Sequence, residues 1–284
     1  MGLDLSIVII NHNTRQLTEQ AVQSILNTKP QVTYEIIVVD NSNKDEERFT
    51  CNHEFVTVIE YVENKGFAHG CNTGAAVARG EYLLFLNSDT IMQAHTLDAS
   101  VWYMQQNPQT GGLGVQVVLA DGELDHACKR GFPTLWNAFC YFAHLDKLFP
   151  KVPLFNGYRL GHLDRNTTHY VDAVTGAYLM MPTELYKKLN GFDETFFMYG
   201  EDLDLCWKIK AAGYHVLYYA PVTCLHLKGQ SGKAAQNPVV KYHFYNAMLI
   251  FYDRYYQDKY PAWLTGAVKW AIRQRMPKLD GETV

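Results

Sequence analysis

The sequence predicts an α/β protein with a mostly parallel central sheet, flanked by helices and followed by C-terminal helices. Short apolar runs alternate with helical patterns through the first half of the chain, and the runs are continuously apolar. Continuous apolar strands are typical of a parallel sheet that is covered on both faces. The expected strands are residues 5–10, 35–40, 56–61 and 81–86.

Helical patterns separate these strands. The first helix is capped by Asn13 or Thr14 and ends before Pro30, which cannot continue a helix. The second helix is expected over residues 67–78, which are rich in small side chains. The apolar face of the first helix consists of Leu17, Ala21 and Ile25, with Val22 and Leu26 beside them.

The second half of the chain is less regular. We expect loops and short helices over residues 130–170, which lack a clean period and are rich in aromatic residues. Residues 1–235 are expected to form one domain, with halves at 1–110 and 111–235, and residues 236–284 a helical extension. The other expected elements are strands at 112–119, 171–181 and 214–219, a hairpin turn at Asp121–Gly122, and helices at 185–189 and 201–212.

Composition excludes several classes of protein. The chain has 284 residues, 48% of them hydrophobic and 19% charged, which suits a globular fold with a substantial core. A net charge of -4 gives no electrostatic footprint for nucleic acid. The six cysteines form no CxxC pair, so reduced thiols in a cytosol are expected. A basic leader and a long apolar stretch are both missing, so we expect a cytoplasmic protein.

Polar clusters follow three of the expected strands. They are Asn11–Asn13, Asp40–Ser42 and Asn87–Asp89. In open α/β sheets ligands bind beyond the carboxyl ends of the strands, so these clusters point to one crevice. Turns are polar in most proteins, and it is the recurrence at one edge that favours a binding site.

Two residues are candidates for holding a metal ion. Asp89 follows a buried strand, and a carboxylate facing a phosphate crevice suits Mg²⁺ or Mn²⁺. His226 lies just past another expected strand, where its imidazole is a candidate second ligand. The alternatives are an ordinary turn aspartate and a structural histidine.

Three carboxylates, Glu201, Asp202 and Asp204, stand at the start of an expected helix. The helix dipole favours acidic residues there, so ordinary capping is one interpretation. The other is a general base, which must be ionised at neutral pH to accept a proton. The sequence contains no GxxxxGK[ST] loop, no GxGxxG after the first strand and no GxSxG elbow, which argues against P-loop kinases, dinucleotide-binding enzymes and serine hydrolases.

Together these motifs resemble the inverting family-two glycosyltransferases of the GT-A fold, and most closely their bacterial rhamnosyltransferase branch. The resemblance spans roughly residues 5–232. The aspartate-rich metal motif of the family reads Asn87–Ser88–Asp89 here, with one acidic residue. The matching blocks are Ser6–Asn13, Val38–Ser42, Asn64–Ala68 with Asn72 and Gly74, Gly80–Asp89, Val174–Ala177, Gly191–Glu194 with Phe196 and Phe197, Gly200–Leu205, and His226 with Gly229 and Ser231.

The resemblance implies a role for each candidate residue. Asp40 would hydrogen-bond the pyrimidine ring of the nucleotide. Asp89 would bind Mn²⁺ or Mg²⁺ with help from His226. Asp202, beside Glu201, would be the catalytic base. The remaining nucleotide-sugar-binding residues would be Asn11, Asn13, Asn41, Asn64, Gly66, Asn72, Asn87 and Ser88.

The implied reaction is a single displacement with inversion, in which a sugar passes from a nucleotide sugar to a hydroxyl of a glycan or lipid-linked saccharide. The branch suggests dTDP-L-rhamnose as donor and bacterial cell-surface polysaccharide synthesis as the setting. Alternative donors are UDP-hexoses or UDP-N-acetylhexosamines. Two rival functions are a non-catalytic nucleotide-sugar-binding scaffold and a nucleotidyltransferase. A nucleotidyltransferase normally has a glycine- and Arg/Lys-rich phosphate loop after the first strand, and Asn11–Thr14 is not such a loop.

The segment 260–278 permits two interpretations. Between Trp263 and Lys278 it is basic and contains no acidic residue, and Trp263 and Trp270 share one helical face. Basic residues mixed with tryptophan suit an anionic lipid surface, here the inner face of the plasma membrane. The more ordinary interpretation, which the sequence alone favours, is a helix that packs its tryptophans on the catalytic domain.

Overall fold

The computed structural model describes residues 2–60, 63–227 and 237–279 and contains a nine-stranded mixed sheet in the order β3-β2-β1-β4-β8-β6-β9-β5, with β7 paired to β9. The strands are β1 (Leu3–Asn11), β2 (Tyr34–Asp40), β3 (Val56–Glu60), β4 (Gly80–Asn87), β5 (Thr90–Met92), β6 (Thr110–Leu119), β7 (His169–Val171), β8 (Tyr178–Pro182) and β9 (His215–His226). The helices are α1 (Arg15–Thr28), α2 (Phe67–Val77), α3 (Thr96–Gln106), α4 (Leu135–Phe142), α5 (Leu145–Leu148), α6 (Thr183–Lys188), α7 (Glu201–Ala211), α8 (Pro238–Tyr255) and α9 (Ala262–Arg275).

The first half of the sheet has the predicted parallel arrangement. β1 pairs in parallel with β2 and β4, and β2 with β3. β1, β2 and β4 are almost wholly buried, as continuous apolar runs require, whereas the edge strand β3 is partly exposed. Beyond β4 the sheet becomes mixed, because β8 runs antiparallel to both β4 and β6.

Small side chains on α2 allow this helix to lie close against the sheet. A Cβ atom on Gly74 would come within 2.5 Å of the Val8 side chain of β1. Gly70, nearer the start of α2, approaches Ile10 in the same way, at 3.0 Å, close to the carboxyl end of β1 where a polar cluster follows.

Several predicted elements differ in the structure. The single strand predicted over residues 171–181 is wrong in its first part: β8 forms from Tyr178, but Asp172–Ala177 leaves the sheet between β7 and β8. The backbone groups there bond elsewhere: the Gly176 N–H donates to Asp202, and the Val174 carbonyl accepts from Arg130. In α1 the predicted Ala21, Val22 and Ile25 are buried together with Thr18, while Leu17 lines a cavity. Strand β9 continues to His226, and β5 and α3 had not been predicted.

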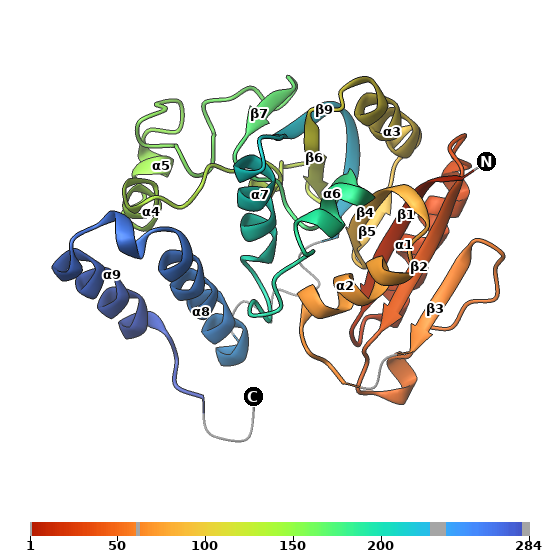
Figure 1. Cartoon of the computed structure of the whole chain (residues 1–284), viewed down its shortest axis with the longest axis horizontal. Coiled ribbons are helices and arrows are strands. Elements are labelled where there is room, and N and C mark those ends of the chain that lie inside the picture. The colour runs from red at the N-terminus through yellow and green to blue at the C-terminus, as the bar shows by residue number, and fades with distance from the viewer. Residues whose placement is uncertain (1, 61–62, 228–236, 280–284) are drawn as a thin grey trace.

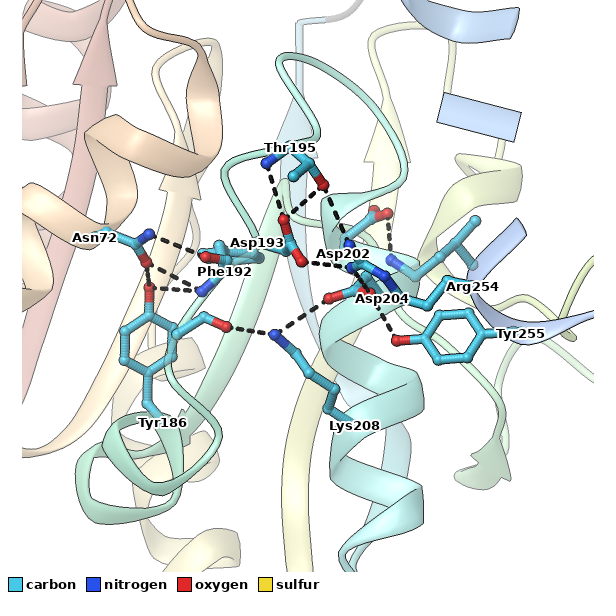
Figure 2. Close-up of polar contacts among 12 residues, drawn as sticks. Asn72, Tyr186, Phe192, Asp193, Thr195, Asp202, Asp204, Lys208, Arg254 and Tyr255 are labelled. Atoms are coloured by element: carbon cyan, nitrogen blue, oxygen red, sulfur yellow. Dashed lines mark hydrogen bonds and ion pairs between the residues drawn. The ribbon is translucent and has the colours of Figure 1, made fainter. Parts of the chain in front are cut away.

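α8 belongs to the body of the protein. The Asp204 carboxylate on α7 is fully buried and accepts hydrogen bonds from Arg254 Nη1 at 2.7 Å and Tyr255 Oη at 2.6 Å. Lys208 Nζ lies 3.1 Å from the other oxygen of Asp204. Arg254 also pairs with Asp193, at 2.5 Å, so that one guanidinium joins α8 to α7 and to the loop before it (Figure 2). The predicted boundary at residue 235 lies outside the described residues.

α9 lies beside α8 at the end of the molecule opposite β3, with α4 and α5 nearby (Figure 1). None of its residues is buried. Trp263 and Trp270 are 74% and 65% exposed, so the interpretation that these tryptophans pack on the catalytic domain is wrong. Within the described residues, no helix has the length and apolarity needed to cross a bilayer.

We expect Arg254→Met to lower the free energy of unfolding by about 2 kcal/mol, the range for losing a hydrogen bond to a buried charge. Lys208 and Tyr255 still contact Asp204 in this variant, which limits the loss. Urea unfolding would measure it, with Arg273→Met at an exposed position of α9 as control. Equal stability of the two variants would show that α8 is not held through this ion pair.

Candidate active site

A cavity of about 560 Å³ lies at the carboxyl ends of β1 and β4 and reaches α7 and α8. Its volume is in the range of small-molecule binding sites. Asn11, Asn13, Asp40 and Asn72 are not part of its wall. The predicted residues that line it are Asn41, Asn64, Gly66, Asn87, Ser88, Asp89, Glu201, Asp202 and His226.

Asn11 and Asp40 form a buried support at the carboxyl ends of β1 and β2. Asn11 Nδ2 donates to Asp40 Oδ2 at 3.0 Å and to Ser42 Oγ at 2.9 Å. Asp40 also accepts from the backbone N–H groups of Ser42 and Phe49. These bonds fix the loop after β2 against the end of β1. The predicted contact of Asp40 with a pyrimidine ring stays a prediction, since the carboxylate is 4% exposed and already has these partners.

The loop after β1 continues this support. Asn13 has a positive φ of 55° and donates through Nδ2 to Asn43 Oδ1 at 2.7 Å. Its backbone N–H donates to Ser42 Oγ at 3.0 Å. Asn13 therefore joins the turns after β1 and β2.

A cluster of three polar residues, each from a different segment, faces the cavity: His12, Asn41 and Asn64. His12 Nδ1 lies 3.0 Å from the Asn41 carbonyl oxygen, and its Nε2 lies 3.4 Å from Asn64 Nδ2. Asn41 Nδ2 in turn donates to Asn64 Oδ1 at 3.2 Å. The amides of Asn41 and Asn64 thus stand together at the wall, where they can hydrogen-bond a nucleotide sugar. His12 was not among the predicted site residues.

Gly66 is required by a close approach of two loops. Its φ is +99°, and a Cβ atom would come within 2.4 Å of the Phe197 carbonyl oxygen. That carbonyl accepts from the N–H of Phe67, the first residue of α2, at 3.0 Å. The start of α2 is thereby tied to the loop that precedes α7.

Asn72 makes a second link between α2 and this loop. Its side-chain amide exchanges two hydrogen bonds, each 3.0 Å long, with the backbone of Phe192, and it also bonds Tyr186 (Figure 2). Nδ2 additionally donates to Glu194 at 2.8 Å. In the structure Asn72 holds the fold beside the cavity; its predicted contact with the donor stays a prediction.

Asp89 and His226 face each other at the cavity wall. Asp89 Oδ1 lies 3.0 Å from His226 Nε2, and the other imidazole nitrogen, Nδ1, lies 3.0 Å from Asp125 Oδ2. Burial would lower the pKa of His226, but the hydrogen bonds and charges of Asp125 and Asp89 raise it to about 9. The described residues contain no group of three or more His, Cys, Asp or Glu side chains suited to hold a metal, since the imidazole separates these carboxylates.

Asn87 and Ser88 complete this edge. The Asn87 N–H donates to the Ala177 carbonyl at 3.2 Å, and Ser88 Oγ lies 3.1 Å from Thr14 Oγ1. The backbone of the turn after β4 is thus fixed by the 172–177 segment on one side and by the start of α1 on the other. Both residues line the cavity beside Asp89.

Asp202 is held from two sides at the opposite wall. Its Oδ2 accepts from Arg130 Nη2 at 2.6 Å and from the Gly176 N–H at 3.1 Å. The ion pair is largely buried, with each side chain 11% exposed. A buried carboxylate needs a compensating charge of this kind. Arg130 lies 72 positions from Asp202 in a region without clean periodicity, so the sequence offered no signal that would pair them.

Glu201, the neighbour of Asp202, has a different environment. Its side chain is buried, and Oε2 has no hydrogen-bond partner among the described residues. Burial, followed by the nearby charge of Asp202, raises the pKa of Glu201 to about 8. The two neighbouring carboxyl groups therefore differ: Asp202 has a cationic partner and Glu201 does not. Environments that separate two carboxyl groups in this way are typical of acid–base sites.

Comparison with known proteins identifies the family. A sequence profile of glycosyl transferase family 2 matches residues 6–184, and one of the N-terminal domain of galactosyltransferase matches residues 165–227. The chain belongs to glycosyltransferase family 2, as its motifs predict.

Individual curated proteins that the chain resembles share a low sequence identity with it. The chain is 24% identical over 246 residues to the rhamnosyltransferase WbbL of Escherichia coli K12, covering 84% of this chain and 88% of that protein. It is 26% identical over 243 residues to the O-antigen biosynthesis protein RfbC of Myxococcus xanthus, covering 84% of this chain but 18% of that protein. With an N-acetylglucosaminyl-diphospho-decaprenol L-rhamnosyltransferase of Mycobacterium tuberculosis it shares 25% identity over 194 residues, 68% of this chain and 60% of that protein.

Solved structures confirm the predicted GT-A fold. A mannosyltransferase from Pyrobaculum calidifontis, in complex with GDP-mannose and Mn²⁺, superposes with a TM-score of 0.59 at 18% identity, covering 95% of this chain and 72% of that one. GalNAc-T7 with UDP, GalNAc and Mn²⁺ gives a TM-score of 0.59 at 17% identity, covering 80% of this chain and 45% of that one.

The environment of Glu201 generates a pH prediction. A carboxyl group whose pKa rises on folding, here from 4.5 to about 8, binds its proton more tightly in the folded protein. As the pH rises from 4.5 to about 8, the unfolded protein gives up this proton before the folded protein does, so the free energy of unfolding falls progressively. We expect Glu201→Gln to raise the melting temperature at pH 8 and to change it little at pH 4.5. Thermal unfolding across this range would measure it, with exposed Glu184→Gln as control; a gain independent of pH would contradict the argument.

Proposed function

We propose that this protein transfers L-rhamnose from dTDP-L-rhamnose, with inversion, to a hydroxyl of a glycan or lipid-linked saccharide in bacterial cell-surface polysaccharide synthesis. The observation that carries the proposal is the placement of Asp202 and the Asp89–His226 pair on one cavity. The family supports sugar transfer, and the names of the relatives support rhamnose and a lipid-linked acceptor.

Asp89 and His226 fit a divalent cation. Their facing oxygen and nitrogen atoms offer two protein ligands, and hard cations in phosphate sites take the rest from phosphates and water. Asp125 orients the imidazole through Nδ1, as carboxylates do behind ligating histidines. When bound, Mn²⁺ or Mg²⁺ would neutralise charge on the leaving diphosphate. His226 gives up its proton for this role, because a ligating imidazole is neutral.

Asp202 is the proposed catalytic base. It accepts the proton of the acceptor hydroxyl as the oxygen attacks the anomeric carbon from the face opposite the diphosphate. The bond to the diphosphate oxygen breaks in the same step, so the anomeric configuration inverts, as in inverting glycoside hydrolysis. Arg130 and the Gly176 N–H hold the carboxylate in place from the side of Oδ2.

Peripheral membrane contact through residues 260–278 forms part of the proposal. Two exposed tryptophans and three exposed cations, Arg273, Arg275 and Lys278, lie on this segment. Lys269 is not available for lipid, because its Nζ pairs with Asp253 at 2.6 Å. Exposed tryptophan with basic residues suits an anionic lipid surface, where a lipid-linked acceptor would be found.

We expect Asp202→Asn to reduce transfer about a hundredfold or more while leaving donor binding intact, because the amide cannot accept the proton. The measurement is release of dTDP from dTDP-L-rhamnose with a panel of saccharide acceptors, and exposed Asp258→Asn is the control. Near-normal turnover in the variant would move the base to Glu201. If the native protein binds the donor but releases no dTDP with any acceptor, it is a binding scaffold.

We expect Asp89→Ala to remove the part of dTDP affinity that depends on Mn²⁺, because it deletes the carboxylate of the proposed metal pair. Titration calorimetry with dTDP, in the presence of Mn²⁺ or of a chelator, would separate that part. Asp121→Ala, in an exposed turn, is the matched control. A variant whose affinity still rises on adding Mn²⁺ would rule out the metal assignment.

A further inference from the structure

The cavity extends past the candidate catalytic residues into a region that the proposed chemistry does not use. Helices α4, α8 and α9 form its walls there, and every residue that they contribute is uncharged. Ala138 and Phe142 come from α4, Met248 from α8, and Val268 and Ile272 from α9. A nucleotide sugar and a saccharide hydroxyl are polar, so neither accounts for this apolar end.

α9 covers this region without filling it. Polar contacts at its edges hold the helix: Lys269 with Asp253 at 2.6 Å, and Tyr252 Oη with Thr265 Oγ1 at 3.1 Å. The guanidinium carbon of Arg275 lies 4.9 Å from the centroid of the Phe142 ring, a contact that joins α9 to α4. No residue of α9 is buried, although Val268 and Ile272 face the cavity.

Protein interiors are tightly packed and leave few voids. Here the apolar walls under α9 do not close on each other, which suits a site for an apolar ligand. The occupant must be long, because the space runs from Asp202 on α7 to Ile272 near the end of α9. It must also carry a polar part at the Asp202 end, where Arg130 and Glu201 line the same cavity. The apolar walls are continuous with the part of the cavity that Asp202 lines, so an occupant with one polar end and one long apolar end matches both parts.

We propose that the space between α4, α8 and α9 binds the hydrocarbon chain of a lipid diphosphate-linked acceptor, with its saccharide at Asp202. This inference rests on the proposed function for the identity of the polar end, but the chain site can be tested by itself. The chain would leave the cavity beside α9, whose exposed tryptophans suit the membrane interface from which the lipid comes.

The test uses the full chain and measures binding of farnesyl diphosphate and of inorganic diphosphate by calorimetry. Saturating dTDP and Mn²⁺ are present so that diphosphate does not occupy the donor side. We expect farnesyl diphosphate, below its micellar concentration, to bind at least about tenfold more tightly, because its chain leaves water. Ala138→Trp and Val268→Trp fill the space from opposite walls and should each remove that gain. Ala267→Trp, on the exposed side of α9, should keep it.

Thermal unfolding of each variant shows whether it is folded, and the two filling variants are independent of each other. Equal affinity for the two diphosphates in the native protein would overturn the chain site, as would an undiminished gain in both folded filling variants. Pelleting with anionic vesicles but no binding of farnesyl diphosphate would also overturn it and leave surface docking alone. Failure to bind dTDP would instead count against the proposed donor; the chain site would then be tested by the difference in farnesyl diphosphate affinity between the native protein and the two filling variants.

Discussion

The carboxylate of Asp202 joins three parts of the chain that are distant in sequence. Asp202 itself lies in the first turn of α7, Arg130 comes from the loop after β6, and Gly176 comes from the segment between β7 and β8. The Arg130 guanidinium also donates to the Val174 carbonyl, so that one cation fixes both the carboxylate and the segment beside it. Removing one partner of a buried ion pair leaves an uncompensated charge, which costs free energy. The folded state therefore needs all of these segments in place. The same contacts direct the carboxylate into the cavity.

A second set of polar contacts connects α2 with α7 and α8. Asn72 on α2 bonds the backbone of Phe192. The next residue, Asp193, pairs with Arg254 on α8, and Arg254 also bonds Asp204 on α7 (Figure 2). A path of direct contacts therefore runs from α2 to the helix that carries Asp202. α8 is accordingly a structural part of the site, and it is through α8 that α9 is held over the apolar end of the cavity.

The sequence predicted what short-range patterns determine. The four parallel strands, α2 and the start of α7 follow from apolar runs, small residues and the acidic cluster at residues 201–204. The polar turns after β1, β2 and β4 do lie at one edge. Partners contributed by irregular segments could not be predicted: Arg130 and Asp125 lie 72 and 101 positions from the residues that they contact. Asp172–Ala177 resembles a strand because it joins two, but its backbone bonds are made with Arg130, Asn87 and the Asp202 side chain, which a pattern of apolar residues does not reveal.

The metal motif illustrates how such partners change the meaning of a motif. By itself Asn87–Ser88–Asp89 provides one carboxylate. The fold brings His226 to Asp89 at the end of β9 and places Asp125 behind the imidazole. The two carboxylates thus stand on either side of one imidazole, and Asp125 fixes the ring so that Nε2 faces Asp89. In the proposed enzyme this arrangement restores negative charge that the motif lacks, because charge behind a ligating histidine strengthens it as a donor.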